Sequence, residues 1–167
     1  DGTASVAALP NAIPLDQGGK LFSGLVETAD QLRGFSHVPI IWFRFSAPLA
    51  ARSQHDVVAA DAKSDIFLVD VDPDSAFRGT LTPVVAQTID EDDWTTSGLL
   101  GVAPYPGFVL RPETTYAAVV RTSLGLESGG SLAPDLRFWQ LAHNAIPEGG
   151  RGGAAAEIYA PLWPVLD

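Results

Sequence analysis

The stretch Leu110-Arg111-Pro112-Glu113-Thr114-Thr115-Tyr116 is the most informative part of the sequence for the fold class. Its L-x-P-x-T-x-Y spacing is typical of a tyrosine corner, in which the leucine anchors a turn in the core and the proline stiffens it. The tyrosine stands near the start of the next strand and hydrogen-bonds back to upstream backbone. We therefore expect a structural role for Leu110, Pro112, Thr114 and Tyr116.

Short extended segments are predicted on both sides of this corner. In Ile41-Trp42-Phe43-Arg44-Phe45 the side chains of Ile41, Phe43 and Phe45 share one face, as a half-buried strand requires. Further strands or short extended pieces are predicted at residues 66–71, 80–89, 99–102, 108–110, 116–122 and 136–141. Because these pieces recur at intervals of about ten residues with Gly and Pro between them, the sequence predicts an all-β fold, an antiparallel β-sandwich.

The two ends of the chain differ in composition from this middle part. Residues 1–35 predict an N-terminal arm with a short helix within 21–33, and residues 36–142 predict the sandwich. Residues 143–167 combine a Gly-rich linker with an apolar helix at 154–163 that Pro161 interrupts. We expect the apolar side chains of this tail to dock on the domain or on further protein, namely Leu162, Trp163, Val165 and Leu166.

The charge balance sets aside several classes of partner. The 167 residues include 20 Asp and Glu against 10 Lys and Arg, a net charge of −10. That charge repels phosphate backbones and anionic lipid surfaces, so no nucleic-acid partner is expected. Cysteine is absent, which excludes disulfides, thiolate metal sites and cysteine nucleophiles. No apolar run approaches the roughly 18 residues that a transmembrane helix needs. The absence of methionine predicts a processed chain or a fragment.

Several segments of the sequence resemble a known family. Residues 108–120, followed by Leu126-Glu127-Ser128-Gly129-Gly130-Ser131-Leu132, resemble the closing strands of bacterial Ig-like domains of the SbsA type, and residues 41–49 resemble their opening strand. Residues 34–36, the stretch Phe67-Leu68-Val69-Asp70-Val71-Asp72-Pro73-Asp74-Ser75 and residues 104–120 are similar, in this order, to the N-terminal Ig-like region of secreted bacterial lipase- or esterase-like proteins. The resemblance implies an Ig-like or fibronectin-III-like sandwich on the exterior of a bacterium. It also implies that the chemistry resides in a downstream α/β-hydrolase domain.

The chain itself lacks the sequence signature of such a hydrolase. The nucleophile elbow G-x-S-x-G does not occur, and His37, His55 and His143 are dispersed without a nucleophile motif. Ser36 and His37 are neighbours in a predicted strand, so their side chains are expected on opposite faces. We therefore assign no catalytic residue within this chain.

The spacing of Asp70, Asp72 and Asp74 admits two interpretations. Alternate carboxylates can converge on calcium, but the twelve-residue calcium loop would need Gly at Ser75 and Glu at Leu81. A turn with Asx-type hydrogen bonds is favoured over the metal site. The acidic run 90–93 is likewise favoured as a solvated loop, with cation binding as the alternative. No organic cofactor is expected, since Gly150-x-Gly152 lies in linker composition rather than after a strand.

The tryptophans offer a further candidate surface for a sugar or polymer. Trp42 and Trp139 are predicted to pack within strands, which leaves Trp94 as the best candidate for exposure.

Three functions follow as hypotheses. The first is a non-catalytic accessory module that docks or presents the rest of a longer chain or another subunit. The second is the N-terminal part of a secreted esterase or lipase whose catalytic domain lies outside this chain. The third is a self-assembling surface protein that inserts its apolar arm or tail into a neighbouring copy.

Overall fold

The computed structural model describes residues 28, 31, 36–93, 95–149, 152–160 and 162–166. The chain divides into two compact units, Asp1–His37 and Val38–Asp167. The predicted arm and the helix within 21–33 lie outside the described residues, apart from Thr28 and Gln31, which are helical. All elements below belong to the second unit.

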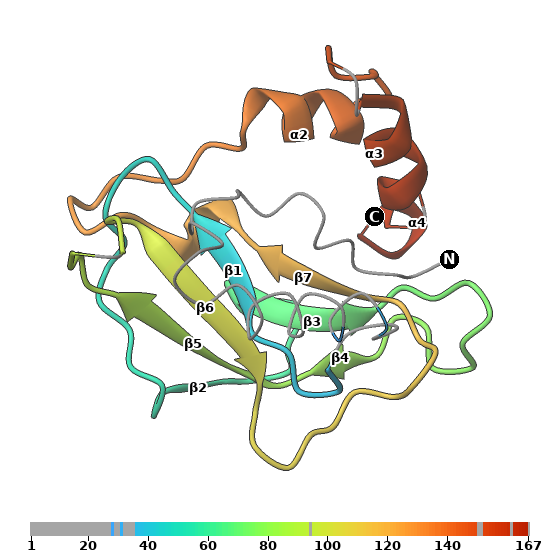
Figure 1. Cartoon of the computed structure of the whole chain (residues 1–167), viewed down its shortest axis with the longest axis horizontal. Coiled ribbons are helices and arrows are strands. Elements are labelled where there is room, and N and C mark those ends of the chain that lie inside the picture. The colour runs from blue at the N-terminus through green and yellow to red at the C-terminus, as the bar shows by residue number, and fades with distance from the viewer. Residues whose placement is uncertain are drawn as a thin grey trace. The chain divides into compact units, whose positions relative to one another are not determined.

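Among the described residues, seven strands form two antiparallel sheets (Figure 1). One sheet has the order β1-β6-β5-β2 and the other the order β4-β3-β7. The chain crosses between the sheets after β2, β4 and β6, which makes the second unit a two-layer β-sandwich, as predicted. The strands are β1 (Ile41–Arg44), β2 (Val57–Val58), β3 (Ile66–Asp70), β4 (Leu81–Thr82), β5 (Val84–Ile89), β6 (Leu99–Pro104) and β7 (Tyr116–Val120).

The predicted strand at 80–89 is divided in two by Pro83. β4 pairs with β3 in one sheet, whereas β5 pairs with β6 and β2 in the other. Proline has no N–H to donate to a ladder, so the pairing stops there and the chain changes sheets. The Pro83 carbonyl instead accepts a hydrogen bond from the Tyr105 N–H at 2.9 Å.

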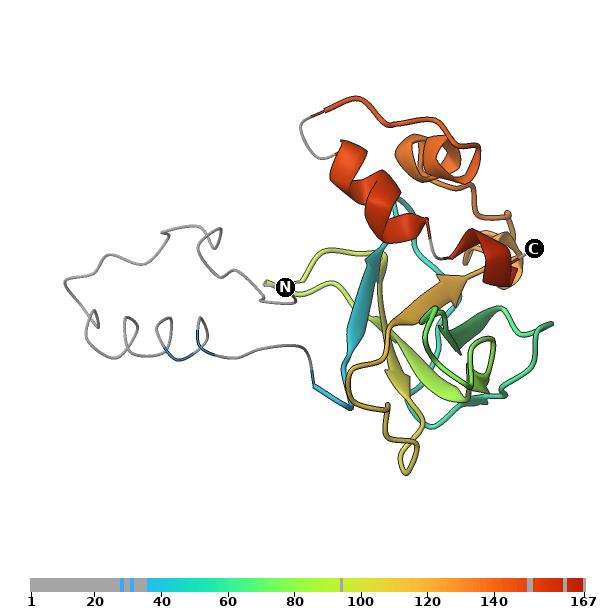
Figure 2. The same ribbon diagram turned by 90° about the vertical axis from the view of Figure 1, so that its right-hand side faces the viewer.

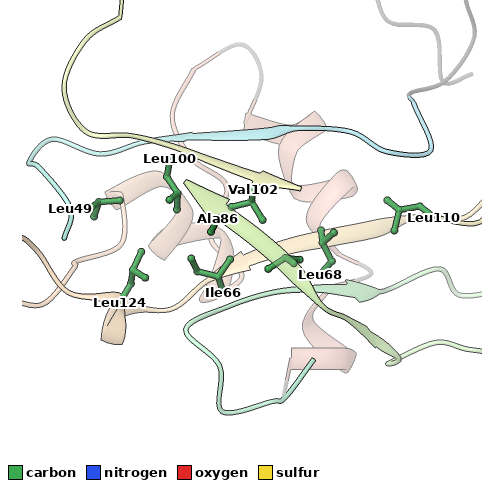
Figure 3. Packing of buried hydrophobic residues seen from close by; sticks show 9 residues of the cluster. Leu49, Ile66, Leu68, Ala86, Leu100, Val102, Leu110 and Leu124 are labelled. Atoms are coloured by element: carbon green, nitrogen blue, oxygen red, sulfur yellow. The ribbon is translucent and has the colours of Figure 1, made fainter. Parts of the chain in front are cut away.

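The main core lies between the two sheets, where inward side chains from both layers meet (Figure 3). Alternation along each strand supplies these side chains, as the period of two requires. Ile66 and Leu68 of β3 face Leu100 and Val102 of β6 in this core and are fully buried. The buried members of the cluster are Leu49, Ile66, Leu68, Val84, Ala86, Leu100, Val102, Leu110 and Leu124.

β3 is buried on both of its faces. Phe67, Val69 and Val71 point away from the main core and form a second apolar cluster with Ala117 of β7. Leu162 and Val165, near the C-terminal end of the chain, pack against this cluster. The continuous apolar run that predicted this strand therefore corresponds to two separate apolar layers.

Helices follow the last strand. They are the 3-10 helix η2 (Thr122–Leu124), α2 (Leu136–Ala142), α3 (Gly152–Tyr159) and α4 (Trp163–Leu166). The predicted apolar helix at 154–163 corresponds to α3 and α4. Figure 2 shows α2 and α3 side by side, with α4 next to the three-stranded sheet.

The predicted strand at 136–141 is wrong, because this segment is α2. Asp135 is the N-cap, and its carboxylate accepts a hydrogen bond from the Arg137 N–H at 2.8 Å. Asn144, with φ of 56°, ends the helix in the left-handed conformation that often follows a helix. These start and stop signals override the strand-like composition of the segment.

Candidate functional site

The two motifs that the sequence analysis singled out meet at one end of the three-stranded sheet. β3 and β7 are antiparallel, with Asp70 opposite Tyr116. The last residue of β3 therefore lies beside the first residue of β7. The Val71 N–H donates to the Thr115 carbonyl at 3.0 Å and extends the contact beyond the ladder. The turn after β3 and the loop before β7 are thus held together.

Asp70 is the centre of a polar cluster in this corner. Its side chain is only 1% exposed, and its carboxylate forms an ion pair with the Arg111 guanidinium, which is 39% exposed. The Ser75 hydroxyl donates to the same carboxylate oxygen, Oδ2, at 2.5 Å, and the Asp72 N–H donates to Oδ1 at 3.0 Å. Each oxygen of the buried carboxylate is therefore satisfied, as burial of a charge requires.

Arg111 and Ser75 have further contacts within the same cluster. The Arg111 guanidinium lies over the Phe77 ring at 4.2 Å from its centroid, a cation–π arrangement. The Ser75 hydroxyl accepts a hydrogen bond from the Phe77 N–H at 3.1 Å. Asp70 at the end of β3 and Phe77 in the turn that follows it therefore both contact the Arg111 side chain.

Asp72 joins the turn to the loop before β7. Its Oδ1 accepts a hydrogen bond from the Asp74 N–H at 3.0 Å, and its Oδ2 accepts one from the Thr115 N–H at 2.9 Å. The Asp74 N–H, followed by the Thr115 N–H, lowers the pKa of the Asp72 carboxyl below its ordinary value, because both bonds favour the ionised form.

The residues of the expected tyrosine corner lie around the same loop. The Tyr116 hydroxyl accepts a hydrogen bond from the Arg111 N–H at 3.2 Å, which is a bond to upstream backbone of the expected kind. Leu110 is buried in the main core. The Thr114 hydroxyl donates to the Pro112 carbonyl at 2.9 Å, and Pro112 itself is exposed.

The carboxylates of Asp70 and Asp72 accept hydrogen bonds within the turn, and Asp74 is exposed. The three carboxylates do not converge on one point. Within the described residues, no three His, Cys, Asp or Glu side chains are grouped as metal ligands would be. The acidic run 90–93 is exposed, and Asp92 Oδ1 accepts a hydrogen bond from the Thr95 N–H at 2.6 Å. The hydrogen bonds of Asp72 and Asp92 are of the kind that aspartate side chains form in turns.

The histidines and the serine of the corner do not form a nucleophilic pair. The Ser75 hydroxyl donates a hydrogen bond to the Asp70 carboxylate, which is ion-paired with Arg111, rather than to a histidine. His143 follows α2, and its Nδ1 lies 2.8 Å from the Trp139 carbonyl, so that Nδ1 is the protonated nitrogen. His37 lies before β1 and His55 is exposed before β2.

The C-terminal residues that were expected to mediate an interaction lie on two sides of α4. Leu162 and Val165 pack on the outward cluster of β3 and β7. Trp163 stacks with Tyr159 at 6.4 Å between ring centroids and lies 6.0 Å from Phe138 of α2. The tail therefore docks on its own domain. The side chain of Leu166 lies outside the described residues.

We call α2, α3 and α4 the helical cap. Its members pack on one another, since Phe138 meets Tyr159 edge to face at 5.8 Å. The cap and the loop between α2 and α3 also carry large apolar side chains that face solvent. Those with the greatest exposed fractions are Leu136 (68%), Ile146 (68%), Ile158 (73%) and Trp139 (47%).

Two of the predicted tryptophan placements are wrong. Trp139 lies on a helix and is half exposed, stacked on His143 at 4.1 Å. Trp42 belongs to β1 as expected, but its indole is 53% exposed on the outer face of the sheet, opposite Gly101 of β6. The alternation that buries Ile41 and Phe43 sends Trp42 outward. Trp94 lies outside the described residues.

A second exposed apolar group lies on the loop between β6 and β7. The Phe108 N–H donates to the Tyr105 carbonyl at 2.9 Å, which closes a turn with Pro106 and Gly107 in the central positions. Gly107 has φ of 99°, as the second central position of a type II turn requires. The turn presents Tyr105 and Phe108 to solvent with their rings 6.2 Å apart.

The described surface also has a shallow depression at the other end of the four-stranded sheet. It is lined by Pro48, Leu49, Ala51, Thr88, Ile89, Asp90, Glu91, Ser97, Gly98, Leu99 and Glu127. None of these is a histidine, lysine or arginine, and its polar rim is acidic.

Comparisons with known proteins add no relative. No protein-family model matches the chain, and no curated protein or solved structure is significantly similar to it. No helix in the described part of the chain is long and apolar enough to cross a bilayer.

Arg111 and Ser75 were not predicted as partners of Asp70, nor Phe77 as a partner of Arg111 and Ser75. Arg111 is 41 residues from Asp70, and only the register of β3 with β7 brings the two together. A local signal did exist for Ser75, because a serine shortly after an aspartate at a strand end often closes a turn.

Proposed function

We propose that this chain is a non-catalytic interaction module, an Ig-like or fibronectin-III-like domain of a secreted or cell-surface bacterial protein. The observation that carries the proposal is the solvent-facing side of the helical cap. Leu136 and Trp139 of α2, Ile146 of the following loop and Ile158 of α3 are all exposed, while Leu162 and Val165 anchor the cap on the sandwich. Exposed apolar groups of this kind are typical of surfaces that another protein covers.

The polar chemistry of the described residues supports a scaffold rather than a catalyst. The buried carboxylate of Asp70 is ion-paired with Arg111 and accepts a hydrogen bond from the Ser75 hydroxyl, so both groups serve the turn. The rigid corner fixes the ends of β3 and β7, and β3 is the strand on which the tail packs.

The occupant of the exposed side of the cap is proposed to be the rest of a longer chain. The resemblance of residues 34–36, 67–75 and 104–120 to regions that precede α/β-hydrolase domains favours such a domain as the occupant. In that arrangement the natural protein hydrolyses esters, whereas this chain on its own does not.

The test compares the purified 167-residue chain with the natively purified protein. For the isolated chain we expect no turnover of p-nitrophenyl butyrate above a heat-denatured control. We expect the amides of α2 and α3 to exchange hydrogen faster in the isolated chain than in the native protein, where the cap is covered.

Two results would count against the proposal. Saturable ester hydrolysis by the isolated chain would place a catalytic site within it. Equal exchange of α2 and α3 in both preparations would mean that the cap has no partner. Light scattering on the native protein distinguishes a longer polypeptide from copies of a 17.6 kDa chain.

A further inference from the structure

The outward face of the three-stranded sheet is an apolar surface that one short helix covers. Phe67 and Val69 of β3 and Val71, the residue after it, are nearly completely buried, together with Ala117 of β7. Leu81 and Val119 lie at its margins. The face is on the opposite side of β3 from the main core, and Leu162 and Val165 cover it together with the Arg121 guanidinium, which lies over the Phe67 ring at 5.7 Å from its centroid.

The cover is held by docking rather than by its own helical propensity. α4 has four residues, far below the length at which an isolated helix is stable in water. Leu162 and Val165 are three residues apart, so they lie on one side of this turn, and the Val165 N–H donates to the Leu162 carbonyl at 3.0 Å. The sheet face therefore selects a helical turn with a Leu-x-x-Val pattern.

The sheet face contacts the side chains of this turn and does not depend on the covalent link between the turn and the rest of the chain. The cluster that the turn packs against is made of side chains on and next to β3 and on β7, with Leu81 of β4 at its margin, and the pairing is between apolar surfaces. The same segment of a second copy presents the identical Leu-x-x-Val turn. Exchange of such an element between protomers preserves every contact of the closed form.

We propose that the outward face of β3 and β7 is a binding site for a Leu-x-x-Val helical turn, which α4 occupies within its own chain and which α4 of a second copy can occupy in its place. This site is on the inner side of the helical cap. It is therefore independent of the exposed side on which the proposed function rests.

The experiment uses the full chain with its own cover weakened by Leu162→Asp and Val165→Asp. The probe is a fluorescein-labelled peptide with the sequence of residues 152–167, and binding is measured by fluorescence anisotropy. We expect the double variant to bind the peptide at least tenfold more tightly than the unaltered chain does, because α4 competes within the unaltered chain. A peptide that carries the same two substitutions is the matched control and is expected not to bind.

Dimer formation is the second readout. The unaltered chain, opened in mild denaturant and refolded at high concentration, is expected to give a dimer fraction on size exclusion with light scattering. The double variant is expected to give none. If circular dichroism shows that the aspartate variant does not fold, Leu162→Ala with Val165→Ala replaces it in both measurements.

Three results would overturn the inference. A folded double variant that does not bind the peptide would show that the face does not recognise the turn. Equal binding of the substituted peptide would show that the contact is unspecific. A dimer that persists in the double variant would mean that α4 is not the exchanged element.

Discussion

Tyr116 is half-buried at the start of β7, with its hydroxyl against the backbone of Arg111. Substitution of Tyr116 by Phe removes the acceptor for the Arg111 N–H and leaves the ring in place. We expect the free energy of unfolding in urea to fall by about 1 kcal/mol.

Tyr105→Phe is the matched control for this change, because Tyr105 is exposed on the type II turn. Its effect is expected to stay within about 0.5 kcal/mol. Equal effects of the two substitutions would show that the hydrogen bond to Arg111 adds no stability.

Asp72 gives the corner a dependence on pH. Its pKa is lowered in the folded chain, mainly by the Asp74 N–H and then by the Thr115 N–H, relative to an unfolded value of about 4. The stabilisation is therefore fully present above the unfolded pKa and is lost as the pH falls through the lower, folded pKa. Asp72→Asn is expected to destabilise the chain at pH 6, with a difference from the unaltered chain that shrinks towards pH 2.

Urea denaturation at a series of pH values measures this difference. Asp74→Asn is the control, since the Asp74 carboxylate is exposed while its N–H still donates to Asp72. A difference between the Asp72 variant and the unaltered chain that is constant over the acid range would contradict the assignment.

Single residues also show how far the candidate corner could be predicted. Asp70 and Tyr116 stand out in the sequence because each belongs to a turn motif with its own spacing. The partner of Asp70 could not be predicted, since Arg111 approaches it only after β3 and β7 have paired. Local residue spacing predicts which residues form turns, whereas the register of the sheet decides which charged side chains form an ion pair.

At the scale of elements, the packing of the start of α3 against the loop that follows α2 depends on Gly152. A Cβ on Gly152 would lie 1.9 Å from the carbonyl oxygen of Pro147, and backbone at that distance has to move. Gly152→Ala is therefore expected to lower the free energy of unfolding by about 1–3 kcal/mol, the usual cost of overpacking. Urea denaturation followed by tryptophan fluorescence measures the change.

The adjacent glycine supplies an unusually close control. A Cβ on Gly153 would meet nothing within 4 Å, and alanine is a better helix former than glycine. Gly153→Ala is expected to be neutral or to stabilise the chain by up to about 1 kcal/mol. Destabilisation of similar size by both substitutions would point to the helix itself rather than to the contact with Pro147.

Elements differ in how well their sequences predicted them. The runs 66–71 and 116–122 correspond to β3 and β7 because their composition and their packing agree. The segment 136–141 has strand-like composition, but Asp135 and Asn144 delimit a helix around it. β2 was not predicted, since two residues carry no period that could be recognised.

At the scale of the whole molecule, the two-layer arrangement followed from the spacing of strands and turns. The Gly-rich composition of residues 148–153 indicated a linker, and the apolar tail after it was expected to dock either on the domain or on further protein. In the structure the chain returns, and Leu162 and Val165 cover the sheet. Docking of this kind depends on the outward apolar face of β3. The continuous apolar run of a strand predicts burial on both faces, but it does not predict which element covers the outward face.

The double burial of β3 has a consequence for synthesis. Phe67 and Val69 leave the ribosome roughly 95 residues before the side chains that will shield them. At about 5–20 residues per second this interval lasts on the order of 5 to 20 seconds. During that time the nascent sandwich can close only one of its two apolar layers. A chaperone that recognises exposed strands would thus meet this chain at Phe67 and Val69, and its release would await the arrival of Leu162 and Val165.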